Sequence, residues 1–138
     1  MKQYQRLLTI ESHGRGLHQI SDKIVTFIDG SGIEDGLLTL LIRHTSASLL
    51  IQENASPDAH ADLEEYFARL APERAAYRHC DEGADDMPAH LRAALTQTSL
   101  AIPVQGGALM LGRWQGIFLF EHRAHAHRRE IAAHIFGE

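Results

Sequence analysis

The stretch that most restricts how this chain can fold is residues 117–120, IFLF, where four consecutive side chains are apolar. In a strand with one face in water, apolar and polar residues alternate, because successive side chains point to opposite faces. This stretch has no such alternation. The sequence therefore predicts a sheet that is covered on both faces, by helices, by a second sheet or by a partner subunit.

Several other segments are typical of strands, because they are apolar, short and bounded by glycine or polar turn residues. They are residues 4–12 (YQRLLTIES), 37–45 (LLTLLIRHT), 47–53 (ASLLIQE), 99–104 (SLAIPV), 107–122 and 129–136 (REIAAHIF). The second and third of them form either two strands or one long bent strand. In all, about eight strands are expected.

Three segments are predicted to be helices, because their apolar residues recur at helical spacing or because capping residues precede them. They are residues 21–29 with Ser21 or Asp22 as N-cap, 56–72 with Ser56 as N-cap, and 87–96, which follow Asp86. The second helix has one apolar stripe, formed by Leu63, Tyr66, Phe67 and Leu70. In the third helix, Leu91 and Leu95 are expected to face inward, with Ala94 beside them.

These helices lie between groups of strands, which predicts an α+β fold with a mainly antiparallel, β-sandwich-like core and about three inserted helices. A chain of 138 residues suits one domain over residues 1–138. The net charge of −5 argues against nucleic acid as a partner, and no apolar run approaches the roughly 20 residues that cross a membrane. The single cysteine, Cys80, suits a reducing compartment, so a cytoplasmic protein is expected.

Ten histidines exceed ordinary usage, and one group of them includes acidic neighbours. His79, Asp85, Asp86 and His90 lie within the segment YRHCDEGADDMPAH. On a helix, Asp86 and His90 would occupy neighbouring positions of one face. Two imidazoles and a carboxylate could bind a divalent metal such as zinc and leave one position open. Alternatively, the aspartates cap the helix, but one aspartate is enough for that.

A second group is RHTSAS, where His44 follows an apolar strand and Ser46 and Ser48 share its face. These polar groups either bond to nearby backbone or line a pocket with His44 as acid, base or ligand. In HRAHAHRRE, the three histidines His122, His125 and His127 are interpreted as a solvated turn. Arg128 and Arg129, at the start of the last strand, are the better candidates for binding a phosphate.

The segment LGRWQGI contains the only tryptophan of the chain. Trp114 could belong to the core or support a ligand, and Gln115 could present its amide to a planar ring. Asn54, just before the second helix, could cap that helix or line a site. Cys80 has no activating partner besides His79, so a thiol nucleophile is not expected.

Four motifs together resemble the YjbQ family, which is known as a secondary thiamine-phosphate synthase family: HTSASLLIQEN, YRH…EGADDMPAHLR, TSLAIPV and LGRWQGIFLFEHR. The resemblance covers essentially the whole chain. It implies a compact α+β fold, a homotrimer and a polar, histidine-lined pocket near subunit boundaries. The positions that match the family's recurring residues are His44, Thr45, Ser46, Asn54, His79, Asp85, Asp86, His90, Trp114, Gln115, Glu121 and Arg128.

The activity implied by the resemblance joins an aminopyrimidine methyl diphosphate to a thiazole phosphate and releases diphosphate, as a main or a secondary reaction. The hypothesis assigns a divalent metal, zinc or magnesium, to His79, Asp86 and His90. It assigns catalysis to His44, Asp85 and Arg128, and the contacts with a small phosphorylated substrate to Thr45, Ser46, Asn54, Trp114, Gln115, Glu121 and Arg128. One aspartate then caps the helix and the other, Asp86, faces the metal. The alternatives are a metal-dependent hydrolase and a non-catalytic trimeric protein that binds metal or ligand.

Overall fold

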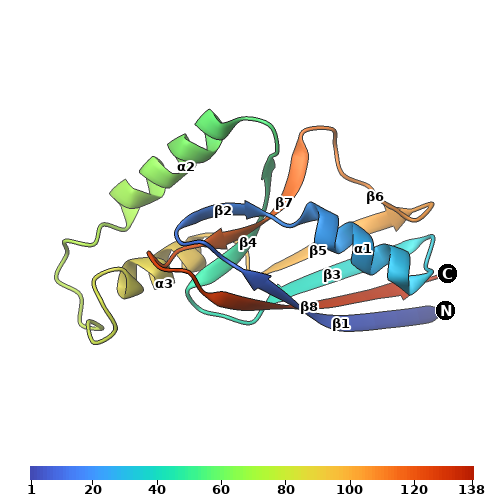
Figure 1. Ribbon diagram of the computed structural model, residues 1–138, viewed down its shortest axis with the longest axis horizontal. Coiled ribbons are helices and arrows are strands. Elements are labelled where there is room, and N and C mark those ends of the chain that lie inside the picture. Colours follow the sequence, from blue (N-terminus) through green and yellow to red (C-terminus); the bar gives the residue numbers. More distant parts are fainter.

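The structure is a computed structural model that describes all residues from 1 to 138 (Figure 1). Its elements are β1 (Lys2–Glu11), β2 (Gly16–Gln19), α1 (Ser21–Ser31), β3 (Gly36–Ile42), β4 (Ala47–Glu53), α2 (Pro57–Leu70), α3 (Asp86–Leu95), β5 (Ser99–Gln105), β6 (Ala108–Leu109), β7 (Gln115–Glu121) and β8 (Arg128–Gly137). The predicted α+β class, with eight strands and three helices, is confirmed. The long apolar segment between residues 37 and 53 forms two separate strands.

The strands form two antiparallel sheets, and the residues between them make the apolar core. One sheet has the order β1-β8-β3-β5-β6 and the other has the order β2-β7-β4. Buried side chains of both sheets belong to one cluster of 19 residues, to which α1 adds Ile24, Phe27 and Ile28. The two sheets therefore lie on either side of one core, as the sandwich-like prediction required.

The run in β7 that has no alternation is buried on both faces, as predicted. Ile117 and Leu119 belong to the core between the sheets. On the opposite face, the ring of Phe120 lies 5.6 Å from that of Phe67 on α2, and the ring of Phe118 lies 5.0 Å from that of His60. A helix, rather than another sheet, covers this second face.

Helix α2 projects from the body of the molecule (Figure 1). Its predicted N-cap is confirmed, because the Ser56 hydroxyl accepts a hydrogen bond from the Ala59 N–H at 3.2 Å. Of the predicted apolar stripe, only Phe67 is buried, whereas Tyr66 and Leu70 are about half exposed. None of the three helices combines the length and apolarity that crossing a membrane requires.

Two predictions about helix α1 and helix α3 are wrong. Neither Ser21 nor Asp22 caps α1 with its side chain, because the Ser21 hydroxyl accepts a hydrogen bond from the Ile117 N–H of β7 instead. In α3, Leu95 is 61% exposed and Ala94 is also exposed, while Arg92 is buried. The buried face of α3 is mixed and consists of Asp86, Pro88, Ala89, Arg92 and Ala93. Arg92 can be buried there because it donates a hydrogen bond to Glu64 of α2 at 2.7 Å, so its charge is paired.

Candidate metal centre

Four side chains at the start of α3 form the group that could hold a metal ion: His79, Glu82, Asp86 and His90. Their ligand atoms all lie within 4.8 Å of one another. His79 and Glu82 come from the connection between α2 and α3, and Asp86 and His90 lie one turn apart on α3. The structure thus brings together the three residues that the sequence pointed to. Glu82 was missed, because it lies in the non-helical connection before α3, where sequence spacing does not predict which side chains meet.

Asp86 is the centre of this group and is only 2% exposed. Its Oδ2 lies 2.8 Å from His79 Nε2 and 3.2 Å from His90 Nε2. Its Oδ1 lies 3.0 Å from a guanidinium nitrogen of Arg123. Burial raises the pKa of the Asp86 carboxyl, but the charges of His90 and Arg123 and the hydrogen bond from His79 outweigh it and lower the pKa below its ordinary value. Asp86 is therefore a carboxylate with both oxygens engaged.

The ring of His90 is oriented by the backbone. Its Nδ1 lies 2.8 Å from the carbonyl oxygen of Thr45. A carbonyl oxygen can only accept, so Nδ1 carries the hydrogen and Nε2 is the atom directed at Asp86. In metal-binding imidazoles one ring nitrogen donates to a fixed acceptor in the same way, and in His90 the other nitrogen faces Asp86, where an ion would take the place of its proton.

Asp85 does not bind in the centre but holds Arg123 beside it. The Asp85 carboxylate accepts hydrogen bonds from Arg123 Nε at 2.9 Å and from the Ala124 N–H at 2.8 Å. Although burial raises the pKa of Asp85, these hydrogen bonds and the charge of Arg123 lower it to about 2. The hydrogen bond that Arg123 donates to Asp85 in turn raises the pKa of Arg123. Asp85 therefore acts through Arg123 rather than on a bound ligand.

The prediction that one of the two aspartates caps α3 is wrong. Asp85 occupies the N-cap position, yet its side chain makes no capping hydrogen bond. Charge-assisted hydrogen bonds to a guanidinium are stronger than those to a neutral backbone N–H. The carboxylates of Asp85 and Asp86 therefore both pair with Arg123 instead of capping the helix. Arg123 lies in the connection between β7 and β8, far from α3 in the sequence, so no local pattern around the aspartates marks it as their partner.

A second polar group lies beside the centre and is built on Glu121, which is fully buried. Its Oε1 accepts hydrogen bonds from Ser12 Oγ at 2.6 Å and from Arg129 Nε at 2.9 Å. Its Oε2 accepts from the His122 N–H at 3.1 Å and also binds Arg129. Burial raises the pKa of Glu121, but Arg129 and Ser12 lower it further than burial raises it. Every oxygen of Glu121 is thus occupied within the chain.

His44 and its neighbours contact this second group. His44 Nε2 accepts a hydrogen bond from the Glu130 N–H at 2.8 Å. Burial and the charge of Arg129 lower the pKa of His44, so its ring is neutral. The Ser46 carbonyl accepts a hydrogen bond from Arg129 at 3.3 Å, and Thr45 holds His90 through its own carbonyl. The RHTSAS segment therefore positions the centre mainly through its backbone.

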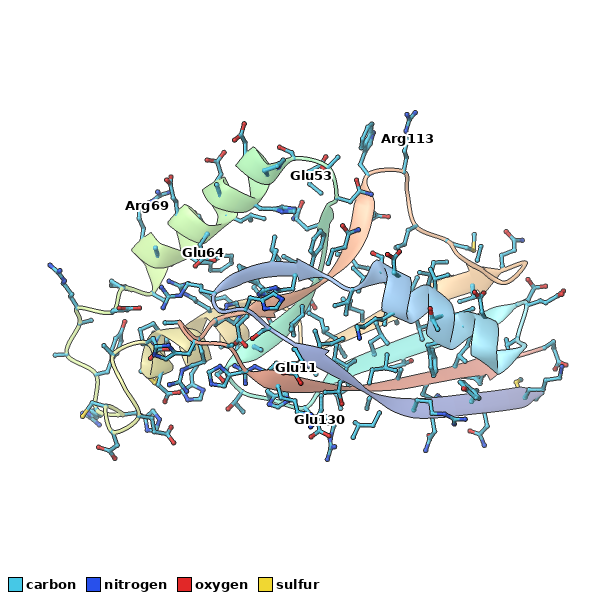
Figure 2. The ribbon with its side chains drawn as sticks, viewed as in Figure 1. Glu11, Glu53, Glu64, Arg69, Arg113 and Glu130 are labelled. Atoms are coloured by element: carbon cyan, nitrogen blue, oxygen red, sulfur yellow. The ribbon has the colours of Figure 1, made fainter.

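The remaining matched residues lie elsewhere in the chain. Strands β4 and β7 are antiparallel, with Ala47 opposite Glu121 at one end and Glu53 opposite Gln115 at the other. Asn54 directly follows Glu53, and Trp114 directly precedes Gln115. Both therefore lie at this second end, roughly 20 Å along the strands from Glu121. Figure 2 shows Arg113 at the tip of the β6–β7 connection, far from α3. Within one chain, Asn54, Trp114 and Gln115 are therefore not part of the metal group.

Arg128 and His122 differ in their exposure to solvent. Arg128 is exposed at the start of β8, and its guanidinium makes no hydrogen bond or ion pair within the chain. His122 is fully buried, with Nε2 2.9 Å from Ser48 Oγ, so the predicted solvated turn holds for His125 and is wrong for His122. Burial and the nearby charge of Arg92 lower the pKa of His122 to about 3.

We expect replacement of His122 by Gln to reduce the loss of stability at acidic pH. In the folded protein His122 stays neutral down to a pKa of about 3, whereas in the unfolded chain it gains a proton near pH 6.5. Its contribution is therefore fully present above pH 6.5 and is lost as the pH falls toward 3, by up to about 1.4 kcal/mol per pH unit. Urea unfolding from pH 7 to pH 4 should show a shallower slope for the variant. Equal slopes would contradict the buried neutral imidazole.

The comparisons with known proteins agree on one family. The family model described as UPF0047 protein YjbQ-like matches residues 6–138. A UPF0047 protein of Synechocystis is 52% identical over 99% of this chain and 94% of its own length. The UPF0047 protein YjbQ of Salmonella typhimurium is 48% identical over 98% of this chain and 99% of its own length.

Solved structures show the same fold. A hypothetical protein of Aeropyrum pernix K1 gives a TM-score of 0.87 at 28% identity, covering 98% of this chain and 99% of its own. A protein of Sulfolobus solfataricus P2, described as YbjQ-like and of unknown function, gives a TM-score of 0.86 over 99% of both chains at 24% identity. The arrangement of sheets and helices described above is thus shared with both.

Proposed function

Because this chain belongs to the YjbQ (UPF0047) family, we propose that it binds a divalent metal at His79, Asp86 and His90 and uses it in a thiamine-phosphate synthase-type transfer. The reaction would join an aminopyrimidine methyl diphosphate to a thiazole phosphate and release diphosphate, as a main or a secondary activity. One observation carries the metal assignment. Two imidazole Nε2 atoms point at one oxygen of a buried carboxylate, and the Thr45 carbonyl holds one of these rings in place.

The residues present fit a metal ion, and they favour zinc over magnesium. Zinc accepts imidazole nitrogen and carboxylate oxygen together, whereas magnesium prefers oxygen ligands alone. When bound, the ion would supply positive charge near the diphosphate that leaves. Asp86 and the two histidines would hold it, and Asp85 would keep Arg123 in position against Asp86.

Other residues of the chain fit the remaining roles in the proposal. Of the three arginines Arg123, Arg128 and Arg129, the first and last are engaged by carboxylates, so Arg128 is the one of these three that is free to bind a phosphate. The hypothesis from the resemblance assigns His44 to catalysis, but its Nε2 already accepts the Glu130 N–H and burial lowers its pKa, so its proposed part is to position the neighbouring Thr45 rather than to take up a proton. Glu121 is fully buried, so its proposed part is to hold Arg129 rather than to touch a substrate.

The proposal includes a homotrimer. The outer face of the five-stranded sheet carries exposed apolar side chains, among them Leu7, Leu41 and Phe136, and no helix of the chain has its buried side chains there. Exposed apolar area of this kind is typical of surfaces that self-associate. In such an assembly, Trp114 and Gln115 would contact a ring bound at the centre of a neighbouring copy, since they lie too far from their own.

Formation of thiamine phosphate from the two purified substrates, with Zn²⁺ supplied, tests the proposal. We expect product with the unmodified protein, and none with the Asp86→Asn variant. A metal-dependent hydrolase is the second candidate, because His79 is about half exposed and the centre is open to water. Release of phosphate from one substrate alone would identify it. Binding of metal and substrates without any turnover would instead favour a non-catalytic binding protein.

A further inference from the structure

The two carboxylates of the metal group are held very differently. The Asp86 side chain is 3% exposed and the Glu82 side chain is 64% exposed. We propose that Asp86 is a fixed ligand and that Glu82 is an exchangeable one, which an incoming oxyanion, phosphoryl or carboxylate, displaces from the metal. This inference rests on the metal centre of the proposed function and adds how that centre opens and what class of group it accepts.

Asp86 is fixed because both of its oxygens have partners on different elements. Arg123 binds Oδ1 at 3.0 Å, which leaves only Oδ2 to face the two histidines. Arg123 is itself held by Asp85 at 2.9 Å. To leave the centre, the buried Asp86 carboxylate would have to give up its ion pair with Arg123, and unpaired buried charges are strongly unfavourable.

Glu82 is loosely held because its side chain is exposed and its one ion pair is long. Its Oε2 lies 3.5 Å from His79 Nε2, and contacts of this length between exposed groups contribute about 0–1 kcal/mol. Its backbone, however, is anchored, because Arg123 Nη2 donates to the Glu82 carbonyl at 2.9 Å. Gly83, which follows, has a φ of 105° that favours glycine and marks a tight turn. The Glu82 side chain can therefore swing out while the loop stays in place.

The charge of the group indicates what replaces Glu82. With both carboxylates bound, a divalent ion is neutralised by two negative charges. Departure of Glu82 leaves one uncompensated positive charge, with Arg123 still paired to Asp85 and Asp86. A neutral ligand would not restore the balance, whereas an oxyanion would. The vacated position therefore selects a phosphoryl or carboxylate group over an uncharged one.

The test uses the full chain loaded with Co²⁺, whose absorption spectrum reports changes of ligand. In the Glu82→Gln variant we expect the affinity for Co²⁺ to fall by no more than about tenfold, against a fall of at least about 100-fold in Asp86→Asn. Titration with inorganic phosphate should change the spectrum of both the unmodified protein and Glu82→Gln. The variant should bind phosphate about fivefold more tightly or better, because no internal carboxylate competes.

Asp81→Asn is the matched control, since it removes the same charge from the same loop at a side chain outside the group. Its phosphate affinity should stay within about twofold of the unmodified protein. A parallel titration with acetate separates the two sources of oxyanion: a response to phosphate alone assigns a phosphoryl group, and a response to acetate alone assigns a carboxylate. A response to neither overturns the inference.

The inference and the proposed function fail in different ways. If Glu82→Gln loses Co²⁺ as completely as Asp86→Asn, or binds phosphate no better than Asp81→Asn, Glu82 is not exchangeable, while the metal centre stands. If the unmodified protein binds neither Co²⁺ nor Zn²⁺, the metal centre itself is wrong and the inference falls with it.

Discussion

The Asp86→Asn variant is expected to bind Zn²⁺ at least about 100-fold more weakly than the unmodified protein. Asp86 Oδ2 is the one oxygen that both imidazoles of the centre share, and it is buried. An amide in its place keeps the shape but removes the negative charge that a divalent ion requires. Competition with a chromophoric chelator measures the change directly.

His90→Ala gives a second measurement of the same centre, because it removes a ligand without disturbing the pair between Asp86 and Arg123. We expect a similar loss of Zn²⁺ in this variant. The matched control is His125→Ala, at an exposed histidine outside the group. Thermal unfolding without metal confirms that each variant is folded. Full Zn²⁺ occupancy in a folded His90→Ala protein would rule out His90 as a ligand.

The Glu121→Ala variant is expected to lose about 3–5 kcal/mol of unfolding free energy. Glu121 is fully buried and Arg129 is 4% exposed, so the substitution leaves a guanidinium in the interior without its carboxylate. The Ser12 hydroxyl and the His122 N–H lose their acceptor as well. Urea unfolding, analysed at equal m-values, measures the difference.

A double variant, Glu121→Leu with Arg129→Met, separates the cost of an unpaired charge from the cost of a lost pair. Replacing both members of a buried ion pair by apolar side chains is often neutral or stabilising. We therefore expect the double variant to recover most of the stability that Glu121→Ala loses. A loss below about 1 kcal/mol in Glu121→Ala would mean that water or another group already compensates Arg129.

Features of the fold that depend on local pattern could be predicted from the sequence. The strands, the Ser56 cap and the covering of residues 117–120 on both faces follow from periodicity and capping chemistry, which act over a few residues. The inward face of α3 could not be predicted in this way. Its direction is set by ion pairs from Arg92 and Asp86 to residues far along the chain, and an apolar pattern carries no information about them.

In the candidate site, too, contacts between residues close in sequence could be predicted, and contacts with distant residues could not. Asp86 and His90 are four residues apart on one helix, so their proximity could be expected from helical spacing, and His79 lies seven residues before Asp86 in the sequence. Arg123 belongs to a connection between two strands, where nothing in the sequence marks its partners. The family resemblance predicts that Trp114 contacts a substrate bound at the metal group. In the structure, Trp114 precedes Gln115, which pairs with Glu53 at the end of β4 and β7 opposite to Glu121.

The hydrogen bond from His90 to the Thr45 carbonyl also affects how substitutions at position 45 are interpreted. Every amino acid has a main-chain carbonyl, so the imidazole keeps its orientation whichever side chain stands there. Only an insertion, a deletion or a shift of the β3–β4 connection would disturb the ring. A defect in Thr45→Val can consequently be attributed to the hydroxyl itself, which makes position 45 a clean probe of direct contact with a bound molecule.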